Sequence, residues 1–314
     1  MQLRLKIVPL HLKSIFMTKI KKQATTFADQ IKILESRGVV VGNHDKAKEI
    51  LADIGYYRLG FYFFPFEITY PFLDSRRKHE VKEDTKFEDA VALYYYDFDL
   101  RNILNKYLSR IEVAIRTTII YELSNKYNDD PIWFVNPSVV SQSFIHDFPV
   151  EVYRKISKKD VIKRHKKKHP QEKYAPAWKT MEFMVFGNLT TLYDNLNVID
   201  DKRLISTHFK VNKTTIFYNY IEAVRNLRNA CAHGNVLYDM TLEKSIKKGP
   251  AGAFNEFQCS RLCSALAVVR YFLKTISPNR LYDMDKELKE ATLKLYGKCP
   301  SIRSLIEQRT GITI

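Results

Sequence analysis

The sequence predicts an all-α fold. Along its longest segments, apolar residues recur at spacings of three and four, which is the period of an amphipathic helix. Capping residues such as Thr26 and Gly55 bracket several of these segments. Convincing strands are scarce, and no internal repeat or low-complexity tract stands out. At 314 residues, the chain is long enough for one large domain or two modest ones with a real hydrophobic core.

Residues 1–24 are expected to form an N-terminal extension. The first 16 residues mix charged and apolar side chains and lack a small-residue cleavage site, so we do not expect a signal peptide. Met17, followed by Thr-Lys-Ile-Lys-Lys, resembles a natural start. Residues 1–16 are therefore interpreted as an upstream addition that contributes little to the fold.

Residues 25–84 form the expected N-terminal helical segment. Its first helix is expected over 25–37, where apolar residues line one side and a glycine follows. Its second is expected over 44–54, opened by Asn43 or Asp45 and closed by Gly55. Thr26 is suited to cap the first helix. Residues 67–84 are polar and irregular, and we expect an exposed loop.

Residues 55–66 lie between these helices and the loop and are rich in aromatic side chains and Arg. One interpretation is a packing joint between the N-terminal helices and the main body. The other is a surface that contacts RNA, in which Tyr57 and Arg58 face solvent.

Residues 85–314 form the expected main domain. Its longest helical pattern runs from 87 to about 128, with a break expected near 97–99. The second half places one apolar stripe on a single side: Leu104, Leu108, Ile111, Ile115, Ile119 and Leu123. Glu112 and Arg116 flank this stripe. They are either an exposed ion pair one helical turn apart or a core-facing pair beside an active cleft.

A strongly basic insertion is expected around 150–174. A Pro- and Ser-containing loop over 129–150 precedes it, and the run 154–173 is compatible with a helix. Its cationic face is either a solvated surface or a track for a nucleic acid backbone. The residues expected to bind RNA there are Lys163, Arg164, Lys166, Lys167 and Lys168. The remaining helices are expected over 177–196, interrupted at Gly187, and over 201–209, 213–232, 254–276 and 285–296.

The charge balance narrows the classes of partner. The chain has 51 Lys and Arg against 35 Asp and Glu, a net charge of +16, which favours nucleic acid or an acidic membrane surface. Aromatic residues make up 13% of the chain, and unpaired RNA bases stack on such rings. No apolar run approaches the roughly 18–20 residues of a membrane span.

Metal and cofactor motifs are not recognisable in the sequence. The four cysteines have no zinc-type spacing and are expected to be buried apolar residues in a reducing cytoplasm: Cys231, Cys259, Cys263 and Cys299. A Gly-rich phosphate loop and an HExxH motif are also missing from the sequence. We therefore expect a cytoplasmic protein that requires no metal or cofactor.

The candidate chemistry is concentrated in residues 225–235. Arginine can clamp a phosphate with several donors, and histidine can transfer a proton near neutral pH. The spacing Arg228-x4-His233 has little weight alone, because two other Arg-x4-His matches occur in this basic chain. The setting distinguishes it, since Arg225 lies one turn before Arg228 and Gly234 marks a helix end. Residues five apart on an ideal helix lie about 140° apart, so sharing one cleft requires the helix to end or distort.

The RNxxxH form of Arg228, Asn229 and His233 resembles the motif of HEPN-superfamily ribonucleases. From about residue 25 onward, the chain resembles the bacterial abortive-infection Abi family of the AbiD/AbiF type. Five segments that carry this resemblance occur in the family's order: 25–41, 54–66, 99–119, 175–193 and 225–238. They are spread over about two thirds of the chain.

This resemblance implies an all-helical HEPN-type bundle and a phage-defence toxin that cuts RNA without a metal. His233 would act as general base or acid, Arg228 would stabilise the phosphorane, and Asn229 would orient either group. Arg225 would assist them, and Glu112 and Arg116, which match the family's IExxxR helix, would brace the cleft. The products would be a 2′,3′-cyclic phosphate and a 5′-hydroxyl.

The resemblance also suggests an assembly. Sites of this superfamily are commonly built from two motifs, and only one convincing motif is present here, so a homodimer is expected. The alternative function is a non-catalytic protein that holds a structured small RNA, such as a regulatory one, through the basic run and Tyr57 with Arg58. A third alternative is binding to a membrane surface.

Overall fold

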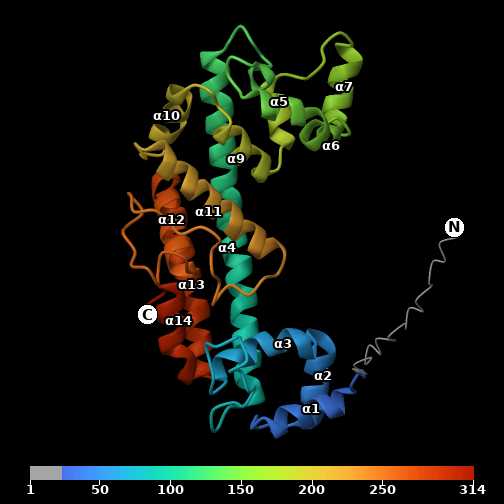
Figure 1. The fold of residues 1–314 in the computed structure, drawn as a ribbon, viewed down its shortest axis with the longest axis vertical. Helices are drawn as coiled ribbons and strands as arrows, with labels where there is room; N and C mark the ends of the chain where they lie inside the picture. Colours follow the sequence, from blue (N-terminus) through green and yellow to red (C-terminus); the bar gives the residue numbers. More distant parts are fainter. Residues whose placement is uncertain (1–22) are drawn as a thin grey trace, which may run out of the picture.

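The computed structural model describes residues 23–314, which form a helical bundle around one long central helix (Figure 1). Within these residues no β-strand is present, and the extended pieces form only isolated bridges, such as the one between Val40 and Lys86. The predicted all-α fold is therefore confirmed. The predicted upstream addition, and all but the last two residues of the predicted extension, lie outside the described residues.

The N-terminal segment contains the two predicted helices and a third one. Thr26 caps the first helix by accepting a hydrogen bond from the N–H of Asp29 (3.2 Å), and Asn43 caps the second by accepting from the N–H of Lys46 (2.9 Å). The expected loop over 67–84 is confirmed, because no helix forms there. The elements are α1 (Phe27–Ser36), α2 (His44–Ile54), α3 (Tyr56–Phe63) and the short 3-10 helix η1 (Phe64–Phe66).

The central helix α4 runs without a break over Phe87–Lys126. At 40 residues it is about 60 Å long, and the other helices pack along it (Figure 1). The break expected near 97–99 is wrong. The carboxylate of Asp97, at the expected break, is buried and hydrogen-bonded by residues from other elements. Tertiary contacts thus stabilise a polar residue that would interrupt an isolated helix.

The insertion after α4 lies beside the C-terminal end of that helix (Figure 1). The loop expected over 129–150 is partly wrong, since Ser141 caps a short helix by accepting from the N–H of Phe144 (3.4 Å). The basic run is helical but divided, with residues 157–159 between its two helices. The elements are η2 (Trp133–Val135), α5 (Gln142–Asp147), the π-helix η3 (Phe148–Tyr153), α6 (Arg154–Ile156), α7 (Asp160–Lys168), α8 (Ala177–Thr180) and η4 (Met181–Phe183).

The interruption predicted at Gly187 lies instead at Met184 and Val185, where the backbone is extended, and Gly187 is inside a helix. The helix expected from 254 begins eight residues later. Carbonyls of the intervening residues accept hydrogen bonds from the loop before them, as Cys259 does from the N–H of Ile246 (2.7 Å). The last helix was not predicted. The elements are α9 (Phe186–Asp194), α10 (Ile199–His208), α11 (Thr214–Ala232), α12 (Leu262–Ile276), α13 (Pro278–Lys298), η5 (Pro300–Ile302) and α14 (Arg303–Thr310).

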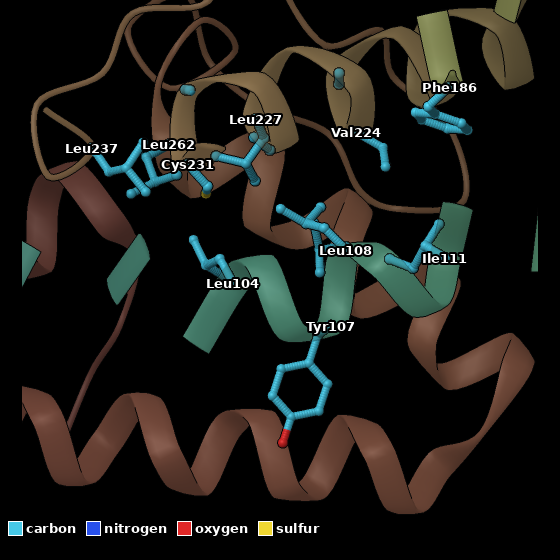
Figure 2. Close-up of a cluster of buried hydrophobic side chains, with 14 of the residues drawn as sticks. Leu104, Tyr107, Leu108, Ile111, Phe186, Val224, Leu227, Cys231, Leu237 and Leu262 are labelled. Carbon is cyan, nitrogen blue, oxygen red and sulfur yellow. The ribbon is translucent and has the colours of Figure 1, made fainter. Parts of the chain in front are cut away.

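The predicted apolar stripe of α4 is the centre of the hydrophobic core, and all six of its residues are fully buried. Figure 2 shows Leu104 and Leu108 of this stripe facing Leu227 and Cys231 of α11. Full burial of a leucine side chain contributes about 1.5–3 kcal/mol. This packing fixes α11 against the middle of α4 and thereby positions the candidate site at the end of α11.

Candidate active site

Helix α11 carries the Arg- and His-containing cluster on its last two turns. Tyr220, Val224 and Leu227 point into the core and leave the polar residues of the cluster on the other faces. The side chains available for chemistry are therefore determined by how α11 packs on α4.

A glycine-dependent cap ends α11 at the predicted position. His233 is the last residue before the turn, and Gly234 follows it with a left-handed φ of 69°. The N–H of Gly234 donates to the carbonyl of Cys231 (3.3 Å), and the N–H of Asn235 donates to that of Ala230 (3.0 Å). This pair of bonds is the Schellman pattern, which favours glycine because a Cβ is strained at such a φ. His233 is consequently held on a defined turn.

The chain beyond the cap is tied to two other helices. Arg58 of α3 donates to the carbonyl oxygen of Gly234 (3.0 Å), and Arg101 of α4 donates to that of Asn235 (3.0 Å). Hydrogen bonds from a charged donor are stronger than those between neutral groups. The position of the cap is therefore determined by residues more than 130 positions away in the sequence.

Asp97 of α4 is the buried anchor of the segment after the cap. Its Oδ1 accepts hydrogen bonds from the N–H groups of Leu237 (2.9 Å) and Tyr238 (2.8 Å). Its Oδ2 accepts from the hydroxyl of Tyr62 (2.9 Å) and from Arg101, with which it forms an ion pair. Burial raises the pKa of the Asp97 carboxyl, while Arg101 and the two N–H groups oppose that rise.

Arg228 and Glu112 connect α11 with α4. The Nε of Arg228 lies 3.6 Å from one carboxylate oxygen of Glu112, and the other oxygen accepts from Arg116 (2.9 Å). Arg116 also donates to the carbonyl of Met184 (2.8 Å). The side chains of Glu112 and Arg116 are only 13% and 11% exposed, so this ion pair is the core-facing one of the two alternatives. Arg228 also donates to Asn229 Oδ1 (3.2 Å).

His233 and Asn229 line a different part of the surface. With Asn226 they border an open hollow of about 460 Å³. His233 is exposed, and within residues 23–314 its imidazole has no hydrogen bond or ion pair. No such contact joins it to Arg228 in this part of the chain either. Because α11 is regular up to Ala232, the side chains of Arg228 and His233 in one chain point in different directions, with Asn229 between them.

Arg225 and Arg228 lie one turn apart on α11 and have different partners. Arg225 forms an ion pair with the buried Glu222 (3.2 Å) and lies 3.5 Å from the hydroxyl of Thr190 on α9. The two arginines therefore pair with different carboxylates, Glu222 on α11 itself and Glu112 on α4.

The residues expected to bind RNA occupy two regions of the molecule. Tyr57 is 83% exposed, as expected, whereas Arg58 is half-buried against Gly234, so the expectation that Arg58 faces solvent is wrong. Leu59 is buried beside them, so residues 55–66 also act as a packing joint. The cationic residues of α7 lie near the opposite end of α4 from α3 (Figure 1), and all five are exposed: Lys163, Arg164, Lys166, Lys167 and Lys168.

Three residues of this region were not identified from the sequence. Asp97 and Arg101 anchor the cap, and Asp239 lines the hollow. The spacing of four between Asp97 and Arg101 is the one feature of the sequence that could have indicated this anchor. Such a pair shares one side of a helix, and the expected break near 97–99 placed the two residues on separate helices. Asp239 gives no comparable signal, because it enters the site through the fold of the loop after α11.

Residues 23–314 contain neither a cluster of metal ligands nor a helix that could span a membrane. No group of three or more His, Cys, Asp or Glu side chains in this range could hold a metal ion. Likewise, none of the helices in the described chain combines the length and the apolar character needed to cross a membrane.

The fold and the site define a basic, all-α protein with an Arg-, Asn- and His-containing helix end beside an open hollow. A family model described as Abi-like protein matches residues 49–239, which is more than half of the chain. The chain belongs to this Abi-like protein family, and this membership suggests a role in abortive infection, the defence against phage. Four of the five resembling segments fall within the matched range. No curated protein and no solved structure matches the chain.

Proposed function

We propose that this Abi-like protein is an endoribonuclease of the HEPN type that cuts RNA by metal-independent acid–base chemistry and acts as a toxin in phage defence. The observation that carries the proposal is the placement of Arg228, Asn229 and His233 on one capped helix end, where Asn229 and His233 line the hollow. The net charge of +16 supports a phosphate-bearing substrate.

In the proposed reaction, the ribose 2′-hydroxyl loses a proton and the leaving 5′-oxygen gains one; His233 transfers one of these protons, and solvent water transfers the other. The 2′-oxygen attacks the adjacent phosphorus, and the bond from phosphorus to the 5′-oxygen breaks. Arg228 stabilises the charge on the phosphorane. The strand ends are a 2′,3′-cyclic phosphate and a 5′-hydroxyl, so no water, metal or cofactor is consumed.

Glu112 is proposed to be a positioning residue in this site. Its carboxylate contacts both Arg116 and Arg228, and Arg116 also donates to the carbonyl of Met184. The side chain of Arg228 is 36% exposed, so it remains open to a phosphate on its outer side. Arg225, by contrast, braces α11 against α9.

The different directions of Arg228 and His233 support a homodimer. A composite site would take Arg228 from one protomer and His233 from the other, which one unbroken helix does not provide alone. Mixing Arg228→Ala with His233→Ala tests this assembly. A heterodimer of the two variants has one intact composite site, so random pairing should restore about a quarter of the parent activity. Unchanged inactivity after mixing would refute this division of residues between protomers.

The catalytic assignment is tested with total bacterial RNA in the presence of EDTA. The parent should produce cyclic-phosphate ends, and His233→Ala should lose about 10²–10⁴-fold in rate because general acid–base catalysis contributes this much. Arg228→Ala should also lose cleavage. His208→Ala and Arg203→Ala are matched controls, because they belong to the Arg-x4-His match on α10 and should cut like the parent. If His233→Ala and Arg228→Ala also cut like the parent, the assignment is wrong.

A second candidate function is a non-catalytic protein that holds a structured small RNA. The exposed cationic face of α7, near one end of α4, favours it. Such binding should weaken steeply with salt, since each neutralised phosphate releases counterions. Bound RNA whose ends stay unchanged would favour this alternative over the nuclease, while cyclic-phosphate ends would exclude it as the sole function.

A further inference from the structure

A pocket separate from the hollow at His233 lies between α1, α3 and the loop over 67–84. Its volume is about 240 Å³, below the roughly 300–1,000 Å³ of pockets for drug-sized ligands. Aromatic side chains supply much of its wall, among them Tyr57 and Phe61, which are 83% and 47% exposed. Their ring centroids are 5.4 Å apart in an edge-to-face arrangement. The pocket is therefore sized for one small planar ring system, and open aromatic faces lie at its rim.

The polar lining of this pocket is net positive. Glu67 is only 2% exposed and accepts two hydrogen bonds from Arg77 (2.7 and 2.6 Å), with His79 Nδ1 3.2 Å from the same carboxylate. These contacts neutralise Glu67 and fix the Arg77 guanidinium. Arg37 is a second guanidinium in the lining, and it forms no ion pair within residues 23–314. Two guanidinium groups against one carboxylate leave an excess positive charge, which suits a phosphate.

Helix α3 links the pocket to the candidate active site. Tyr57, Gly60 and Phe61 of this helix line the pocket, while the intervening Arg58 donates to the carbonyl of Gly234 at the cap of α11 (3.0 Å). One eight-residue helix therefore contacts both places.

We propose that this pocket binds one unpaired nucleobase together with its phosphate. The base would stack against the aromatic wall, and the phosphate would face Arg37 and Arg77. We assign this base and phosphate to the single-stranded RNA that enters the site at His233, so this inference rests on the proposed function. A free nucleotide has the same chemistry, and the experiment distinguishes the two sources.

Gly60 allows the pocket to be filled without disturbing the fold. A Cβ built on Gly60 meets no atom within 4 Å, and the residue is helical, so Gly60→Leu adds bulk to the pocket and favours the helix. Gly297→Leu is the matched control, because Gly297 is an exposed helical glycine on α13 that also has no atom within 4 Å of its Cβ. Arg37→Gln is compared with Arg280→Gln, an exposed arginine without an ion pair in the described residues.

Binding is measured in a His233→Ala background, which keeps the RNA intact. The probe is a short single-stranded RNA of mixed sequence containing 2-aminopurine, whose fluorescence is quenched on stacking. Gly60→Leu should weaken binding about tenfold and abolish the quenching, since a stacked base contributes that much. Arg37→Gln should weaken binding more than Arg280→Gln does, and Gly297→Leu should bind like its background.

The four nucleoside monophosphates serve as competitors. Weak competition assigns the pocket to the RNA strand, whereas competition as strong as that of the RNA overturns this assignment in favour of a free nucleotide. Equal RNA affinity and quenching in the Gly60→Leu and Gly297→Leu variants would overturn the proposal that this pocket binds a base. This outcome is separate from failure of the proposed nuclease, which is read from cleavage by the parent rather than from binding.

Discussion

Replacing Asp97 by asparagine should destabilise the protein far more than an ordinary surface substitution. The asparagine carbonyl can still accept from the N–H groups of Leu237 and Tyr238, but its NH2 group then faces Arg101 and the Tyr62 hydroxyl in place of Oδ2. Arg101 is 6% exposed, so it is left as a buried charge without its ion-pair partner.

The magnitude follows from that unpaired charge. Removing one partner of a buried ion pair costs about 3–5 kcal/mol of unfolding free energy. Because unfolding entropy is about 2.1 cal/mol/K per residue, a chain of 314 residues loses about 1.5 °C per kcal/mol, and the melting temperature should fall by about 5–8 °C. Replacing Arg101 by methionine in the same chain should recover part of this loss, because no buried charge is then left unpaired.

The assay is thermal unfolding followed by circular dichroism at neutral pH. Asp99→Asn is the matched control, because Asp99 lies two residues further along α4 and pairs with Lys294 at 3.6 Å on the surface. Such pairs contribute about 0–1 kcal/mol. RNA cleavage should also fall in Asp97→Asn, because the anchored segment follows the cap that carries His233. Equal melting temperatures for Asp97→Asn and Asp99→Asn would refute the reasoning.

Two other predictions concern the cap and the thiols. Gly234→Ala should cost about 1–2 kcal/mol in unfolding free energy because of its left-handed φ of 69°, and Gly234→Asn should cost less. Equal melting temperatures for the parent and both variants would show that the helix end does not depend on this glycine. Burial raises the pKa of Cys231 to about 12 and that of Cys299 to about 11, so both should react slowly with a thiol reagent near neutral pH. The partly exposed Cys259 and Cys263 should react first, and all four cysteines should react together in denaturant. Four equal rates in the native protein would contradict the burial of Cys231 and Cys299.

Local patterns in the sequence were sufficient to predict many of the helices. The apolar stripe of α4 predicted its buried side, and Thr26 and Gly234 mark helix ends in the sequence because capping depends on residues adjacent in the chain. The candidate residues Arg228, Asn229 and His233 could be identified for the same reason, since they lie within six positions of one another.

Two of the expectations that were wrong depend on contacts between distant segments. The unbroken course of α4 through Asp97 depends on the amides of Leu237 and Tyr238, 140 and 141 positions away. Arg58 was expected in solvent and instead binds the carbonyl of Gly234, 176 positions away.

The sequence by itself determined the all-α class, the basic surface and the chemical groups at residues 225–235, because periodicity, charge and short motifs are local properties. Only the tertiary structure decided which groups meet. Glu112 is joined to Arg228 through the packing of α11 on α4, whereas Arg228 and His233 are separated by the regular turn of one helix. A side chain's direction depends on the neighbour that buries or pairs it, and that neighbour is selected by the fold rather than by adjacent residues.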